Sequence, residues 1–231
     1  MSMFRPQAFL TGSSLWRGLR VGLFGGSFNP AHEGHLHVAR QAIRRLDLDA
    51  VWWLVSPQNP LKGKADMAPL AARLASAQAM ARDPHIVVTA VEQQLGVRHS
   101  LRTVRALQAR NPDTRFVWIM GADNLAGLHR WQGWRQLMRA VAIAVIDRPG
   151  YSHACLTAPA ARGFGFARVD GRRAKLLARV QPPCWAMIRG PLHQASATAL
   201  RQAGADGLNR TGPINMRSFE ADQGSRPIEK E

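Results

Sequence analysis

The sequence predicts an α/β fold built on a doubly wound, mainly parallel sheet with helices on both faces. Three observations support this prediction. Short apolar runs alternate along the chain with segments of helical periodicity, which is the pattern of consecutive βαβ units. The chain has 231 residues and 46% of them are hydrophobic, which is enough for the core of one generous α/β domain. No internal repeat is visible, so a repeat architecture is not expected.

The first half of the chain predicts three strands and two helices. RVGLFGG at 20–26 is apolar and ends in glycines, and residues 34–46 have helical spacing. VWWLVSP at 51–57 is a continuous apolar run that predicts a buried strand. The segment 69–83 predicts a second helix, and the β-branched run IVVTA at 86–90 predicts a third strand.

The alternation continues in the second half. Residues 100–112 predict a helix that Pro112 ends, and RFVWIMGAD at 115–123 predicts a strand. A helix near 131–139 and a strand at 140–149 are expected next. Beyond them the sequence predicts, in order, a polar and glycine-rich stretch, a strand at 184–190 and a helix from about Ser196.

Strands that are separated by helices pair in parallel through right-handed crossovers. Sheets of this type bind ligands at the carboxyl ends of their strands. The predicted arrangement is therefore Rossmann-like, and the segment that directly follows the first strand is where a ligand site is expected.

Both ends of the chain look different from the middle. We expect a flexible N-terminal extension over residues 1–18, one folded domain over 19–205 and a polar, disordered C-terminal tail over 206–231. No apolar stretch reaches the roughly 18 residues of a membrane span, and the N-terminus lacks the apolar block of a signal peptide. The sequence therefore predicts a cytoplasmic protein without a membrane partner.

The formal net charge is +16, from 31 basic and 15 acidic residues. Such a charge fits a nucleic acid, a membrane surface or an anionic small substrate. The arginines are scattered and form no block, so we expect a solvated arginine-rich surface and no dedicated nucleic-acid partner. Examples are Arg40, Arg73, Arg105, Arg139 and Arg179. The only cysteines, Cys155 and Cys184, are interpreted as ordinary thiols.

GLFGGSFNPAHEGHLH at 22–37 is the segment that follows the first strand. Its glycines do not form GxGxxG, and no GK[ST] follows to make a P-loop. HEGHL has leucine where the second histidine of HExxH must stand, and His37 is turned about 200° from His35 on a helix. Dinucleotide, P-loop and metalloprotease sites are therefore excluded, and no protein-held metal is expected here.

The same segment is well suited to bind an anion. Gly25 and Gly26 allow close approach of the backbone and φ > 0, and Pro30 fixes the entry to a helix. A helix N-terminus presents unpaired N–H groups and a partial positive charge. His32 and His35 add side-chain donors aimed at the same anion.

GSFNPAHEGH at 26–35 resembles the GxFxPxHxGH signature of the nucleotidylyltransferase superfamily, in which HxGH binds ATP phosphates. QASATALR at 194–201 resembles the superfamily's second motif, near ISSTxIR, and keeps Ser196, Thr198 and Arg201. Ala197 and Leu200 depart from that motif. The resemblance implies catalytic roles for His32, His35 and Arg201. The ATP-binding residues it implies are Gly25, Gly26, Ser27, Phe28, His32, His35, Gly121, Asp123, Ser196, Thr198 and Arg201.

The middle of the chain resembles the nicotinate mononucleotide adenylyltransferase family within that superfamily. SPQNPLKGK is similar to its loop after the second strand, GADNLAGLHRW to its GxDxxxxxxxW segment and IDRPGY to its strand-end arginine. RHSLRT stands where that family has SYTxDT, so His99 and Arg102 depart from the pattern. The substrate-binding residues that the resemblance implies are Asn59, Lys62, Ser100, Thr103, Trp131 and Arg148.

The resemblance implies an enzyme of NAD biosynthesis that joins nicotinate mononucleotide and ATP into deamido-NAD and pyrophosphate, with Mg²⁺ held mainly by the ATP phosphates. Two alternatives stay open: an adenylyltransferase for another substrate, such as nicotinamide mononucleotide or phosphopantetheine, and a non-catalytic basic RNA-binding protein. The oligomeric state is also open, a homo-oligomer included.

Several of these residues have plainer interpretations. Trp131 and Trp134 are three apart on a predicted helix, and Trp134 is expected to pack in the core. Trp52 and Trp53 are assigned packing alone, and Asp123 has helix capping as its alternative role.

Overall fold

A computed structural model of the protein describes residues 14–57 and 67–191. The chain divides into two units, residues 1–197 and 198–231, and the described residues belong to the first. The helix expected from Ser196 and the tail at 206–231 lie outside the described residues.

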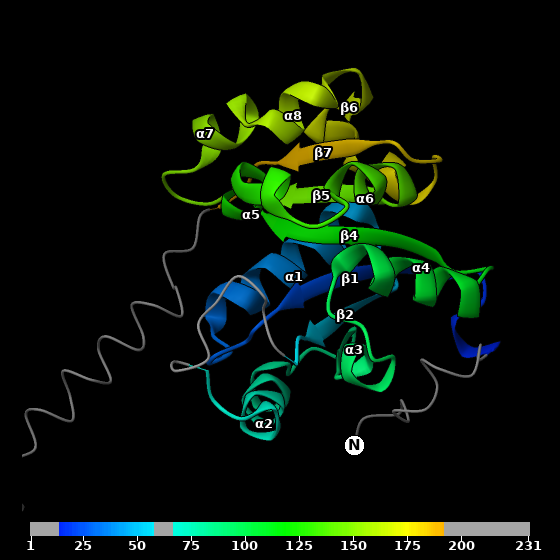
Figure 1. Cartoon of the computed structure of the whole chain (residues 1–231), viewed down its shortest axis with the longest axis vertical. Coiled ribbons are helices and arrows are strands. Elements are labelled where there is room, and N and C mark those ends of the chain that lie inside the picture. Colours follow the sequence, from blue (N-terminus) through cyan, green and yellow to red (C-terminus); the bar gives the residue numbers. More distant parts are fainter. Residues whose placement is uncertain (1–13, 58–66, 192–231) are drawn as a thin grey trace, which may run out of the picture. The chain divides into compact units, whose positions relative to one another are not determined.

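The described residues form a seven-stranded sheet in which every pair of neighbouring strands is parallel (Figure 1). The strand order is β3-β2-β1-β4-β5-β7-β6. The strands are β1 (Arg20–Gly26), β2 (Ala50–Val55), β3 (Ile86–Thr89), β4 (Arg115–Gly121), β5 (Ala142–Ile146), β6 (Arg168–Val169) and β7 (Trp185–Ile188). The predicted parallel α/β arrangement is confirmed.

Helices cover both faces of the sheet, each over its own apolar core. One core includes residues of α1 (Glu33–Leu46), α2 (Leu70–Met80) and the 3₁₀ segment η5 (Gly171–Ala178). The other includes residues of α3 (Val91–Gln94), α4 (Ser100–Arg110), α5 (Ala122–Gly127), η3 (Leu128–Arg130), α6 (Trp134–Ala140), α7 (Ser152–Thr157) and α8 (Pro159–Gly163). Two further 3₁₀ turns are η2 (Ser14–Trp16) and η4 (Gly165–Ala167). None of the helices in the described ranges is long and apolar enough to span a bilayer.

The two cores are filled by alternate residues of the same strands. On β2, Trp52 and Leu54 enter the core beneath α4, whereas Trp53 and Val55 enter the core beneath α1. This alternation follows from the two-residue period of a strand that is covered on both faces. The packing role predicted for Trp52 and Trp53 is confirmed, because both are fully buried.

Two stretches differ from the prediction. Trp131 is not helical: it follows η3 in an extended conformation, and α6 begins only at Trp134. The region 150–183, expected to be polar and irregular, contains α7, α8, η4, β6 and η5. These elements have two to eight residues each. Segments this short show too few turns for helical periodicity to be visible in the sequence.

The N-terminal boundary of the domain also needs correction. Trp16, assigned to the flexible extension, is 1% exposed, and its ring packs edge-on against Trp52 with centroids 4.8 Å apart. Its carbonyl accepts a hydrogen bond from the Thr114 hydroxyl at 2.7 Å. The folded domain therefore includes η2, because a single buried tryptophan outweighs the polar character of its neighbours.

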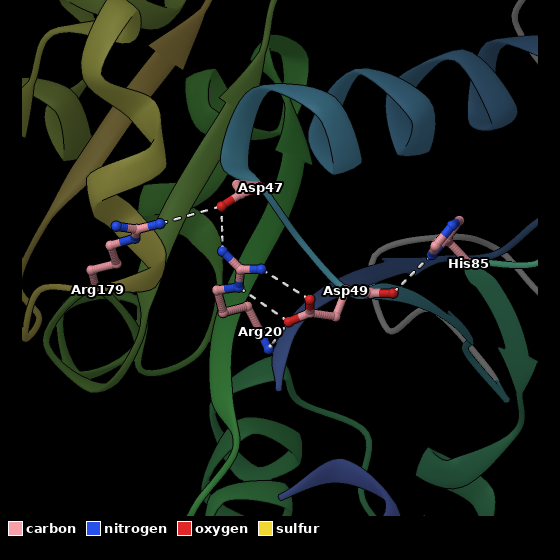
Figure 2. A network of polar contacts seen from close by, with 5 residues as sticks. All are labelled: Arg20, Asp47, Asp49, His85 and Arg179. Atoms are coloured by element: carbon pink, nitrogen blue, oxygen red, sulfur yellow. Dashed lines mark hydrogen bonds and ion pairs between the residues drawn. The ribbon is translucent and has the colours of Figure 1, made fainter. Parts of the chain in front are cut away.

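A polar network joins the amino-terminal edge of the sheet (Figure 2). Arg20, the first residue of β1, donates from Nε and Nη2 to the Asp49 carboxylate at 3.1 and 2.9 Å and from Nη1 to Asp47. Asp47 also accepts from Arg179, which follows η5, at 3.3 Å. Hydrogen bonds from the Arg20 guanidinium lower the pKa of both carboxyl groups. The network ties α1, β1, β2 and the end of η5 together.

Candidate active site

The order in which the chain adds strands to the sheet reverses between β1 and β4. From β1 the strand order runs to β2 and β3 on one side and to β4 and β5 on the other. The loops that follow β1 and β4 therefore leave toward opposite faces of the sheet, and the carboxyl edge between them is where such sheets form a ligand-binding crevice. The sequence-predicted residues next to this crevice are Gly25, Gly26, Ser27, Phe28, His32 and His35 after β1 and Gly121 and Asp123 after β4.

His32 and His35 cap the N-terminus of α1 reciprocally. His32 is the N-cap residue, and its Nδ1 accepts a hydrogen bond from the Gly34 backbone N–H at 3.1 Å. His35 stands three residues later, and its Nδ1 accepts from the His32 backbone N–H at 3.2 Å. Histidine thus fills both positions of a capping box, usually occupied by Ser or Thr and Glu or Gln. The two rings lie close, with centroids 3.9 Å apart.

The capping box indicates which nitrogen of each neutral imidazole ring carries the proton. A nitrogen that accepts from a backbone N–H carries no proton, so we assign the proton of each neutral ring to Nε2. Each Nε2 is therefore a hydrogen-bond donor, at the end of the helix where the macrodipole is positive. Imidazole N–H groups and helix N-termini are both groups that bind anions well.

Phe28 anchors the loop between β1 and α1. Its ring is buried, stacks on Trp53 with centroids 5.0 Å apart, and lies 4.7 Å from the His35 ring. The positive φ expected at Gly25 or Gly26 occurs instead at Phe28, where φ is +47°. Gly25 and Gly26 are instead needed because larger residues would be crowded. A Cβ on Gly25 would lie 3.0 Å from the Trp118 ring, and a Cβ on Gly26 would lie 3.2 Å from the Phe28 ring. Only the backbone of Phe28 remains for the ligand contact predicted there.

Asp123 and Arg148 form the β4 side of the crevice. Asp123 is the second residue of α5, and its Oδ2 accepts from Arg148 Nη1 at 2.9 Å. Its Oδ1 is buried and has no hydrogen-bond partner among the described residues. The side chain makes no capping bond, so the alternative role for Asp123 receives no support. A Cβ on Gly121 would lie 2.3 Å from Oδ1, so glycine leaves space for this carboxylate.

The Trp131 turn lies beside the start of α4. Trp131 is half-buried and meets Trp118 edge-on, with centroids 6.5 Å apart. Gly133, at φ +71°, lies so close to Leu101 that a Cβ would come within 2.8 Å of its side chain. Ser100 begins α4, whose N-terminus has no side-chain cap. Trp131 and the uncapped N-terminus of α4 are therefore brought into one region.

Thr103 has no exposed surface with which it could contact a ligand. It is fully buried, and its hydroxyl donates to Glu92 Oε1 at 2.8 Å. Burial raises the pKa of the Glu92 carboxyl. The backbone N–H groups of Arg102 and Thr103 both donate to the His99 carbonyl, and the Arg102 side chain is exposed. Thr103 is thus a structural residue, and the donors left at this helix start are the N–H groups of Ser100 and Leu101.

The remaining predicted site residues lie outside the described residues. They are Asn59, Lys62, Ser196, Thr198 and Arg201. Within residues 14–57 and 67–191 there is no group of three or more His, Cys, Asp or Glu side chains that could hold a metal ion.

The comparisons with known proteins agree with this geometry. The sequence matches the family described as cytidylyltransferase-like over residues 23–203. The chain belongs to the cytidylyltransferase-like family. Relatives named "Probable nicotinate-nucleotide adenylyltransferase" include one from Rhizobium meliloti, 53% identical over 80% of this chain and 98% of its own length. Another, from a Caulobacter species, is 54% identical over 79% of this chain and 97% of its own.

A solved structure of a more distant protein has a similar fold. The Plasmodium falciparum nicotinic acid mononucleotide adenylyltransferase, complexed with NaAD, covers 80% of this chain and 83% of its own. It matches with a TM-score of 0.60 at 15% sequence identity. At that identity the likeness shows the shared fold.

One residue next to the β1–α1 loop was misjudged from the sequence. Arg73, expected on the solvated surface, is 2% exposed and lies on α2 beneath the β1–α1 loop. Ser76, three residues further, also reaches this loop by accepting from the Ala31 N–H at 3.2 Å. No sequence signal separated these side chains from ordinary surface positions, because their contacts are 45 and 46 residues apart along the chain.

Proposed function

We propose that this protein transfers the adenylyl group of ATP to nicotinate mononucleotide, giving deamido-NAD and pyrophosphate. The observation that carries the proposal is the histidine capping box at the N-terminus of α1, directly after β1, where the strand order of the sheet reverses. The names of relatives about 50% identical over nearly their full length support the choice of mononucleotide.

The reaction needs little covalent help from the protein. A phosphate monoester has a second pKa near 6, so at pH 7 it is largely a dianion and attacks the α-phosphorus of ATP without a general base. One P–O bond forms to the mononucleotide phosphate, and the bond between the α-phosphorus and the bridging oxygen breaks as pyrophosphate leaves. The protein must hold two polyanions in line and stabilise the charge that develops.

His32 and His35 would donate from Nε2 to the phosphate oxygens, supported by the N–H groups at the start of α1. We place Arg201, Ser196 and Thr198 in the same task, as the resemblance of the second motif implies. The unpartnered Asp123 Oδ1 would accept from a hydroxyl or amino group of the adenosine.

The pyridine ring would lie against Trp131, and its carboxylate would accept from the N–H groups that begin α4. Asn59, Lys62 and Arg148 remain candidate contacts of the mononucleotide. Arg148 is already paired with Asp123, so it would act as part of that pair.

A Mg²⁺ ion fits this site as a companion of ATP. Such an ion keeps most of its waters and takes few protein ligands when it is bound mainly by phosphates. Bound to the phosphates, it would neutralise charge on the departing pyrophosphate. We further propose that the enzyme acts in the cytoplasm, and we leave a homo-oligomer open.

The decisive experiment is a substrate panel. Purified protein would be incubated with ATP, Mg²⁺ and one of nicotinate mononucleotide, nicotinamide mononucleotide, FMN or phosphopantetheine, and pyrophosphate release would be measured. We expect the fastest release with nicotinate mononucleotide. Fastest release with another acceptor would contradict the substrate, and no release with any acceptor would contradict the reaction.

A further inference from the structure

We propose that Arg73 is a positioning residue: from α2 it fixes the β1–α1 loop, residues 27–31, so that His32 and His35 meet the phosphates of ATP. The inference rests on the proposed function, since ATP is the ligand that the loop would receive.

The Arg73 guanidinium is buried and bonded entirely to backbone. Its hydrogen bonds run from Nη1 to the carbonyls of Ser27 at 2.8 Å and Ser56 at 2.7 Å, from Nη2 to that of Pro57 at 3.0 Å and from Nε to that of Ala68 at 2.9 Å. No ion pair joins it to a carboxylate in the described part of the chain. Burial lowers the pKa of this group, in agreement with its poor solvation.

These bonds connect three separate segments at the carboxyl edge of the sheet. Ser27 directly follows β1, Ser56 and Pro57 directly follow β2, and Ala68 lies just before α2. One rigid group therefore sets the spacing between the ends of β1 and β2, and β1 is one of the two strands that border the crevice. The planar guanidinium is the side chain with enough donors to do this, since it offers five N–H groups in a fixed fork.

The loop itself is held at alternate residues by α2 and by Ala68, which lies just before that helix. Arg73 binds the carbonyl of residue 27, the Ala68 N–H donates to Asn29 Oδ1 at 3.1 Å, and the Ser76 hydroxyl accepts from the N–H of residue 31. Arg73 and Ser76 are three apart and so share one face of the helix. The next residue after this loop is His32, so any shift of the loop moves the capping box.

Packing alone does not account for an arginine here. A buried cation costs free energy that an apolar side chain of similar volume would not, and the cost is offset only if its hydrogen bonds are all formed. What four carbonyl contacts supply beyond packing is a fixed loop geometry. A misplacement of about 1 Å in a ligand-binding group can cost about 10²-fold in rate.

The test compares Arg73→Met, which removes the donors, with Arg73→Lys, which keeps the charge but has one nitrogen in place of three. Arg82→Met, at an exposed position just after α2, is the matched control. The full-length proteins would be titrated with Mg·ATP by calorimetry, and KM for ATP and kcat would be measured beside the melting temperature.

We expect Arg73→Met to weaken ATP binding and raise KM for ATP by about 10- to 100-fold, Arg73→Lys to lie between it and the wild type, and Arg82→Met to match the wild type. A lowered melting temperature with KM for ATP unchanged within about twofold would reduce Arg73 to a structural role and overturn the proposal. If Arg73→Met does not fold, Arg73→Lys decides by the same criterion.

The binding arm separates this inference from the proposed function. A wild-type protein that binds no Mg·ATP contradicts the proposed function. A wild-type protein that binds Mg·ATP, with an Arg73→Lys variant that binds it equally well, contradicts only the role of Arg73. An error in the identity of the mononucleotide changes neither result, because the titration contains ATP alone.

Discussion

We propose one task for each ring nitrogen of His32, and substitution can separate the two tasks. Nδ1 caps α1 by accepting from the Gly34 N–H, and Nε2 is the donor proposed to meet phosphate. An asparagine side chain places its carbonyl oxygen near the position of Nδ1 but does not extend as far as Nε2. A glutamine side chain places its amide nitrogen near Nε2 and gives up the short-range cap. His32→Asn and His32→Gln are therefore complementary variants.

The magnitudes follow from the two roles. Loss of an N-cap costs about 1 kcal/mol, which for a domain of this size lowers the melting temperature by about 2–4 °C. Loss of one preorganised donor to a developing negative charge costs about 10²–10³ in kcat. His32→Asn should therefore keep the wild-type melting temperature within about 1 °C and lose about 10² in turnover. His32→Gln should lose the 2–4 °C and stay within about tenfold of wild-type turnover.

Calorimetric melting and pyrophosphate release at saturating substrates would be measured for both variants. Arg44→Gln, on the exposed side of α1, is the control for a change of side chain on this helix. Near-normal turnover of His32→Asn would mean that the ring only caps the helix. A His32→Asn protein whose melting temperature falls by the 2–4 °C expected for a lost cap would mean that the capping box is wrong.

Three further predictions concern other parts of the molecule. Trp16→Ala should lower the free energy of unfolding in urea by about 3–5 kcal/mol, because a fully buried indole is removed, and a chain that begins at residue 18 should show the same loss. A chain that begins at residue 14 should keep the wild-type free energy of unfolding. The raised pKa of Glu92 means that the folded state holds this proton more tightly, so its contribution to stability falls as the pH rises above 4.5. Glu92→Gln should therefore gain stability relative to the wild type at pH 8 but not at pH 4; an equal difference at both would contradict the buried carboxyl. Nicotinate mononucleotide should be preferred over nicotinamide mononucleotide by at least about tenfold in kcat/KM, because the amide leaves a donor at the start of α4 unpaired at a cost of about 1–3 kcal/mol. Trp131→Ala should weaken the binding of both substrates alike. Equal use of both substrates by the wild type would refute the assignment.

The parts of the fold that could be predicted are those in which one local pattern fixes the outcome. The strand at 20–26 has the predicted bounds, because an apolar run that ends in glycines has few alternatives. The helix after it begins at Glu33, one residue earlier than expected, since His32 itself is the cap. The histidine pair was recognisable from its HxGH motif, whereas the capping box that the same two residues form was not predicted.

The parts that could not be predicted depend on contacts between distant residues. Trp16 lies in a polar segment, and only its meeting with Trp52 places it in the core. Arg73 has the composition of a surface residue, and only the carbonyls of two remote loops hold it inside. Thr103 was predicted to bind substrate because it matches a position of the family motif, whereas in the fold it is buried and its hydroxyl donates to Glu92. In each case the deciding partner is far away in sequence or cannot be recognised from residue type.

The two edges of the sheet differ in how completely their charged groups are paired. At the amino edge, Arg20 meets the carboxylates of Asp47 and Asp49, so each charge has a partner and the pKa of both acids is lowered (Figure 2). At the carboxyl edge, Arg73 has carbonyl partners only, and Asp123 keeps a buried oxygen without a hydrogen bond among the described residues. Groups left under-satisfied in a folded protein cost stability, and they persist where a ligand completes them. Paired charge at the amino edge thus stabilises the sheet, while the Asp123–Arg148 pair at the carboxyl edge leaves one buried carboxylate oxygen that a bound nucleotide would complete.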